Sequence, residues 1–170
     1  MASKIAALLG SVAFVVGTFA TCAPASAATP SCGNSAIAVS ASQTEGATGH
    51  GSLVLRFRNA SARTCTLRGY PPLSAIAADG RFLARAASSL NGFAGGSHHG
   101  IQLVVLRPGS SASATVEWMN FNAATSGSCP FSASIATAAP NTTRLVSVAR
   151  SVSTCELHVH PVVPGLSGNS

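Results

Sequence analysis

The feature of this sequence that most constrains its fold is a succession of short stretches in which apolar residues occupy every second position. In residues 52–59, Leu53, Leu55 and Phe57 occupy every second position, and in residues 112–121 a second set alternates in the same way up to Trp118. A period of two places successive side chains on opposite faces of a strand. Each stretch therefore predicts a strand with one buried face and one wetter face.

Turn residues separate these stretches at intervals of about ten residues. Asp79-Gly80 is typical of a tight hairpin turn, and Arg107-Pro108-Gly109 closes the apolar run of residues 101–106. No segment keeps a helical period, and no internal repeat is present. The sequence predicts an all-β fold, an antiparallel two-sheet sandwich of about nine short strands, with a closed barrel as the alternative.

The first 27 residues have the composition of an export signal. Lys4 supplies the positive start, residues 5–19 are apolar, and Ala25-Ser26-Ala27 is a small-residue cleavage pattern before Ala28. The apolar run is too short to cross a bilayer, which needs roughly 18 to 20 residues. We therefore expect a cleaved signal peptide at 1–27, a single domain at 28–170 and no transmembrane span in the mature chain. Lipid anchoring through Cys22, which ends a degraded lipobox, is the alternative.

The cysteine count predicts two disulfides. Five cysteines become four once Cys22 leaves with the signal peptide, and an even number fits an oxidising compartment. Four cysteines allow three pairings, and the sequence alone does not choose among them. We expect Cys32–Cys65 and Cys129–Cys155, because sequential pairing ties each terminal strand to a neighbour along the chain.

The charge pattern indicates a mildly basic surface. The formal net charge is +6, and after removal of Lys4 every basic residue other than histidine is an arginine. Only four residues of the chain are acidic. Such a surface can attract a cell-wall polymer or another secreted protein, but the arginines are scattered along the sequence, so we expect no nucleic-acid binding.

A set of motifs distributed over the mature chain resembles a known family. The motifs, in order, are Asn59-Ala60-Ser61, Cys65-Thr66-Leu67-x-Gly69-Tyr70-Pro71, Asp79-Gly80-Arg81, Leu106-x-Pro108-Gly109, Ala112-x-Ala114, Trp118, Cys129 and Cys155. They are similar to a domain-of-unknown-function family found in secreted proteins and lipoproteins of actinobacteria. The resemblance implies an exported, immunoglobulin-like sandwich held by disulfides, and it supplies no catalytic residues.

Histidines are the sharpest candidates for a metal site. His158 and His160 stand two apart on a predicted strand and so share a face, while His98 lies in a long glycine-rich loop at 86–100. Convergence of the three would make a site for zinc or copper. A secreted metal-binding protein is therefore the alternative function, against histidines on an outward-facing edge.

Catalytic motifs are missing, and we expect no enzyme and no cofactor. The sequence has no Gly-x-Ser-x-Gly elbow, no His-Glu-x-x-His and no phosphate-binding glycine loop. Its only aspartate lies in a predicted turn, and its three glutamates show no local pairing. The leading expectation is a non-enzymatic binding module of the cell envelope or extracellular space.

The single tryptophan and the single tyrosine are expected to be structural. A lone Trp118 on an alternating strand is typical of a core residue, and Tyr70 beside Gly69 and Pro71 is expected to anchor a corner by its hydroxyl. An aromatic sugar-binding surface formed by both is the alternative.

Overall fold

The computed structural model describes residues 27–92 and 100–168. The predicted signal peptide up to residue 26, including Cys22, lies outside the described residues, and so does His98. In the described part of the chain, no helix is long and apolar enough to cross a membrane.

The described residues form 15 strands and no helix. The strands are β1 (Ile37–Ala41), β2 (Glu45–Ala47), β3 (His50–Asn59), β4 (Cys65–Arg68), β5 (Leu73–Ile76), β6 (Phe82–Arg85), β7 (Ala87–Ser88), β8 (Leu103–Leu106), β9 (Ser111–Met119), β10 (Phe121–Asn122), β11 (Gly127–Ser128), β12 (Ser134–Thr137), β13 (Val146–Val148), β14 (Cys155–Val159) and β15 (Val163–Pro164).

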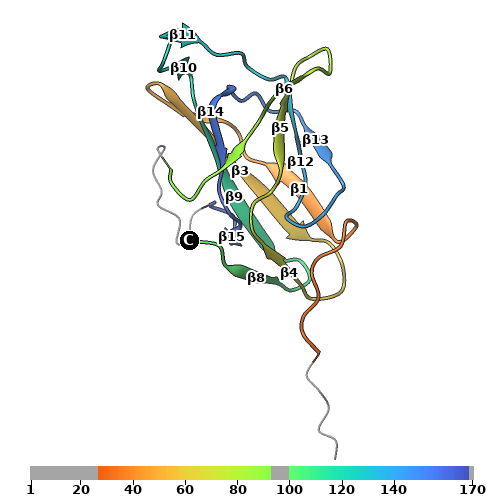
Figure 1. The fold of residues 1–170 in the computed structure, drawn as a ribbon. Coiled ribbons are helices and arrows are strands. Elements are labelled where there is room, and N and C mark those ends of the chain that lie inside the picture. Colours follow the sequence, from red (N-terminus) through yellow and green to blue (C-terminus); the bar gives the residue numbers. More distant parts are fainter. Residues whose placement is uncertain (1–26, 93–99, 169–170) are drawn as a thin grey trace, which may run out of the picture.

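The strands are arranged in two layers (Figure 1). One layer is a seven-stranded sheet in the order β1-β3-β9-β14-β7, with β2 paired to β3 and β15 paired to β9. The other layer contains the four-stranded sheet β13-β12-β5-β6 and the two-stranded sheet β4-β8, while β10 and β11 form a separate hairpin. The all-β class and the two-layer arrangement are confirmed, and the immunoglobulin-like topology stays a prediction.

The alternating stretches form the central pair of the large sheet. β3 and β9 are antiparallel, with Leu53 opposite Val116 and Phe57 opposite Ala112. These side chains are buried in one core together with residues of the second layer, such as Ile135. The period of two therefore predicted the two longest strands and their buried faces correctly.

One strand pairing and the burial of one strand differ from the expected pattern. β14 and β7 are parallel, since β7 follows a crossover from the second layer, so the sheet is not antiparallel throughout. In β8, Val104 and Leu106 are buried but Leu103 and Val105 are more than half exposed. The apolar run at 101–106 thus has one core face and one solvent face, because β4 and β8 form only a thin ribbon over the core.

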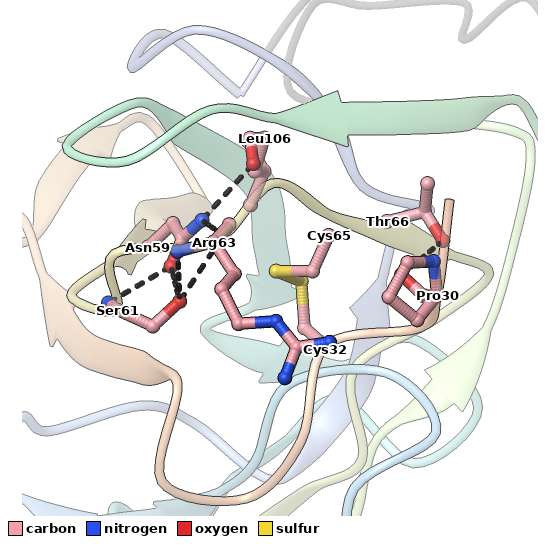
Figure 2. Close-up of a disulfide and its surroundings, with 8 residues drawn as sticks. All are labelled: Pro30, Cys32, Asn59, Ser61, Arg63, Cys65, Thr66 and Leu106. Atoms are coloured by element: carbon pink, nitrogen blue, oxygen red, sulfur yellow. Dashed lines mark hydrogen bonds between the residues drawn. A yellow bond between two sulfur atoms is a disulfide. The ribbon is translucent and has the colours of Figure 1, made fainter. Parts of the chain in front are cut away.

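Both predicted disulfides are present. Cys32–Cys65 joins the entry segment to β4, and Cys129–Cys155 joins the segment after β11 to β14. Next to the first bridge, the Asn59 amide donates to the backbone oxygens of Arg63, at 2.8 Å, and Leu106, at 3.0 Å (Figure 2). This amide fastens the loop between β3 and β4 to the end of β8.

Trp118 is a core residue, as expected, and lies against a glycine. It is 1% exposed, and its indole nitrogen donates to Asn120 Oδ1 at 3.1 Å. A Cβ atom placed on Gly51, which is opposite Trp118 in the sheet, would fall on the indole ring. Gly51 is therefore required by close packing and not by its backbone conformation.

Replacing Gly51 with alanine should lower the free energy of unfolding by about 1–3 kcal/mol, because the rigid indole has to shift within a packed core. Gly33→Ala is the matched control, since nothing lies within 4 Å of its added Cβ. Urea unfolding followed by tryptophan fluorescence measures both variants. Equal stability of the two variants would contradict the packing assigned to Trp118.

Candidate functional site

The most unusual polar feature of the described residues is a fully buried carboxylate beside a fully buried histidine. Glu117 lies on β9 and is 2% exposed, and His160 follows β14 and is 0% exposed. Glutamate and histidine are rarely this buried unless they are paired. The two residues therefore form the first candidate for functional chemistry.

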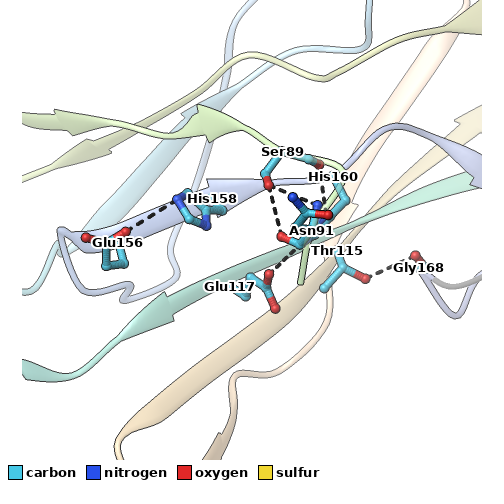
Figure 3. A network of polar contacts seen from close by, with 8 residues as sticks. All are labelled: Ser89, Asn91, Thr115, Glu117, Glu156, His158, His160 and Gly168. Carbon is cyan, nitrogen blue, oxygen red and sulfur yellow. Dashed lines mark hydrogen bonds and ion pairs between the residues drawn. The ribbon is translucent and has the colours of Figure 1, made fainter. Parts of the chain in front are cut away.

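The geometry of the pair assigns one of its protons (Figure 3). His160 Nε2 lies 2.7 Å from Glu117 Oε1, and His160 Nδ1 lies 2.9 Å from the backbone oxygen of Ser89. A carbonyl oxygen only accepts, so Nδ1 carries a proton. His160 Nε2 and the Glu117 carboxylate form a hydrogen bond in this buried setting, so each satisfies a polar group of the other.

Both ring nitrogens of His160 are thus engaged in the core. A general base needs one ring nitrogen within hydrogen-bond reach of the proton that it removes. The Nε2 position that such a base would use is occupied by Glu117, and the Nδ1 position is occupied by Ser89. This arrangement orients and immobilises the imidazole and is typical of a structural pair.

The residues that follow β15 lie against the face of β9 that carries Ser113 and Thr115. β15 pairs with β9, placing Val163 opposite Ser113. Gly168 then donates from its backbone nitrogen to Ser113 Oγ at 2.9 Å and accepts from Thr115 Oγ1 at 3.1 Å. Alternate residues of β9 share a face, so Glu117 lies on the same side of the sheet as Ser113 and Thr115 and opposite to Trp118, and there it contacts His160.

His158 is close to the pair but in a wetter position. It is opposite Glu117 in the β9–β14 register, and its side chain is 22% exposed. Its Nε2 lies 3.6 Å from Glu156 Oε2. Glu156 has a φ of 46° at the bulge that interrupts β14 after Cys155, and this backbone turn explains why register is lost between Cys155 and His158.

The structure corrects one interpretation of the histidines and limits another. His160 is not an exposed edge residue, because it is fully buried and its ring lies between Ser89 and Glu117. Within residues 27–92 and 100–168, no group of three or more histidine, cysteine, aspartate or glutamate side chains could hold a metal ion. Among the described residues, His158 and His160 therefore belong to no such group, and the third candidate of the hypothesis, His98, lies outside them.

The motif at residues 69–71 forms a corner that is tied to the segment after β14. Gly69 has a φ of 100°, which favours glycine, and its backbone oxygen accepts from Val162 at 2.9 Å. Pro71 is buried, whereas Tyr70 is half-buried and its hydroxyl makes no hydrogen bond to the described residues. The hydrogen bond between the backbones of Val162 and Gly69 therefore holds the corner in place, and a role of the tyrosine hydroxyl stays a prediction.

The aromatic sugar-binding surface is also wrong as an interpretation. Trp118 is enclosed in the core at 1% exposure, so it has no free face on which a sugar ring could stack. Tyr70 lies at the corner after β4. The two aromatic residues therefore form no shared exposed platform.

Two depressions lie on the described surface. One of about 350 Å³ is lined by Asn122, Thr154 and Glu156 among others, and another of about 350 Å³ lies between β1 and β13, with Arg144 at its edge. Enzyme sites more often combine an apolar cleft with converging polar groups. Neither depression contains the Glu117–His160 pair.

Comparison with known proteins identifies a family and no characterised relative. No curated protein and no solved structure matches the chain. A family model described as "Domain of unknown function (DUF4232)" matches residues 32–163, which is more than half of the chain. The expected membership of a family of unknown function is thereby confirmed, while the actinobacterial source stays a prediction. The chain belongs to the DUF4232 family.

Proposed function

We propose that this protein is an exported, non-enzymatic binding domain that acts in the cell envelope or the extracellular space. Two lines support export: the composition of residues 1–27 and the two disulfides, which are typical of oxidising compartments. Cleavage before Ala28 would release the domain, and Cys22 offers the alternative of a lipid anchor.

The observation that carries the binding role is the contrast between the core and the surface. The buried Glu117–His160 pair has both imidazole nitrogens engaged, so it is poorly suited to proton transfer. The exposed side chains of the described residues include several arginines and few acids. Such a molecule is better suited to recognising a partner through its surface than to transforming a small molecule.

A retention assay tests this proposal. Oxidised protein starting at Ala28 is mixed with envelope fractions and with the secreted proteins of the cells that produce it. We expect retention that falls as salt is raised from about 0.01 M to 1 M, since screening lengths shorten from roughly 30 Å to 3 Å. A turnover activity that survives purification and is lost on mutation of a surface residue would contradict the proposal, as would no retention at low salt.

A further inference from the structure

Four arginines that are scattered along the sequence come together at one end of the domain. Arg58 is next to the last residue of β3, and Arg63 lies in the loop that follows. Arg107 lies in the turn between β8 and β9, and Arg144 lies between β12 and β13. All four side chains are exposed. We call these four residues the arginine end.

Hydrogen bonds fix the segments that carry these arginines relative to one another. The Asn59 amide donates to the backbone oxygen of Arg63, and the Asn59 backbone oxygen accepts from Gly109 at 2.9 Å, in the turn that contains Arg107. Figure 2 shows Arg63 extending past the Cys32–Cys65 disulfide.

Arg144 is joined to the same end through the entry segment. Its backbone nitrogen donates to Asn34 Oδ1 at 3.1 Å, and Ala60 donates to the oxygen of Ala36 at 2.7 Å. The backbone positions of the four arginines are therefore set by the fold, although their side chains remain in solvent.

The three glutamates lie far from the arginine end along β3, β9 and β14. Glu45 and Glu117 both stand opposite Ser52 in the sheet. Ser52 precedes Arg58 by six residues on β3, which separates their backbones by roughly 20 Å at about 3.3 Å per residue. Glu156 is one residue beyond Cys155, which pairs still further along β9. A separation of this size exceeds the screening length of roughly 8 Å at physiological salt.

Asp79, the remaining acid, lies in the turn between β5 and β6, where the backbone N–H of Arg81 and then the charge of Arg81 hold the pKa of its carboxyl below the usual range. The start of β5, and not this turn, adjoins the loop that carries Arg144, because Leu73 is opposite Thr137. No acidic side chain of the described residues therefore neutralises the arginine end.

We propose that the arginine end binds an extended polyanion whose charges are phosphate groups. Guanidinium groups present a planar fork that matches phosphate oxygens, so arginine is well suited to this chemistry. The four groups extend from four segments around an end and do not converge on one pocket. A polymer with repeated phosphates can contact several of them, whereas a single phosphate ion contacts one or two. This inference rests on the proposed binding function and names its partner class.

The test uses inorganic polyphosphate chains as the probe, with the oxidised protein starting at Ala28. If four phosphates are contacted, affinity should fall roughly 50-fold between 50 mM and 200 mM salt, from a slope of about 0.7 per contact. The double variant Arg58→Gln/Arg107→Gln should bind about tenfold or more weakly, and its salt slope should fall by about half. Fluorescence anisotropy of a labelled chain gives both quantities.

Arg81→Gln/Arg85→Gln is the matched control, because it removes the same charge from exposed positions on and beside β6. Its affinity should stay within twofold of the unmodified protein. An equal loss in both double variants would reduce the effect to net charge and overturn the inference, and so would equal binding of polyglutamate. If polyphosphate does not bind but native envelope fractions still retain the protein, the inference fails and the proposed function stands.

Discussion

Replacing Glu117 with alanine should lower the free energy of unfolding by about 3–5 kcal/mol, which is a large share of a typical total of about 5–15 kcal/mol. The substitution removes the carboxylate that lies 2.7 Å from Nε2 of the fully buried His160. It also leaves a cavity beside the ring of His160. Urea unfolding followed by circular dichroism measures the loss.

Two further variants distinguish the loss of the polar contact from the loss of side-chain volume. Glu117→Gln keeps the volume and can donate an amide hydrogen to Nε2, so its loss should be clearly smaller than that of the alanine variant. Glu117→Leu/His160→Phe replaces both partners with apolar groups and should recover much of the stability, because paired burial of polar groups is weakly stabilising overall. A loss below about 1 kcal/mol in Glu117→Ala would contradict the structural role. A folded Glu117→Gln variant that loses native partner binding would contradict it too.

Removing either disulfide should cost about 3–4 kcal/mol, and removing both should leave the chain largely unfolded. The bridges span 33 and 26 residues of sequence. In the chain-entropy model these lengths differ in effect by only about 0.2 kcal/mol. A larger difference in unfolding free energy between the two double variants, Cys32→Ala/Cys65→Ala and Cys129→Ala/Cys155→Ala, therefore comes from packing in the native state.

The first of these variants is expected to be the less stable one. Cys32 and Cys65 are both buried and belong to the core cluster, whereas Cys155 is half-buried at the edge of a shallow depression. Thermal unfolding of both double variants under identical oxidising conditions makes the comparison. A fully stable chain after reduction of both bridges would contradict the stabilising role assigned to them.

The parts of the fold that could be predicted from sequence are those set by local pattern. The alternation through Leu53 and Phe57 fixes the buried face of β3, and the same period fixes β9, because neighbouring strand residues point to opposite faces. The disulfides followed from an even cysteine count and from pairing in sequence order. Each of these inferences needs only residues that are close in sequence or few in number.

The buried pair could not be predicted in the same way. Glu117 and His160 are 43 residues apart, and the position of Glu117 in an alternating strand indicates a solvent-facing side chain. On that face of β9, Glu117 meets the buried ring of His160, and Gly168 bonds to Ser113 and Thr115. A period of two reports which side chains share a face, but it does not report whether a distant segment covers that face.

The arginine end escaped sequence analysis for a related reason. Arg58, Arg63, Arg107 and Arg144 are spread over 86 residues, so no charge run marks them. Their common position follows from loops that meet at one end of the strands, which is a property of topology.

We infer that the chain works outside the cytoplasm as a domain fastened by two disulfides. Mass spectrometry of the protein recovered, without reduction, from the medium and envelope of the cells that produce it tests this claim most directly. We predict a chain that starts at Ala28 and yields two linked peptide pairs, Cys32 with Cys65 and Cys129 with Cys155. A full-length chain in the cytoplasm with free thiols at these four positions would contradict it.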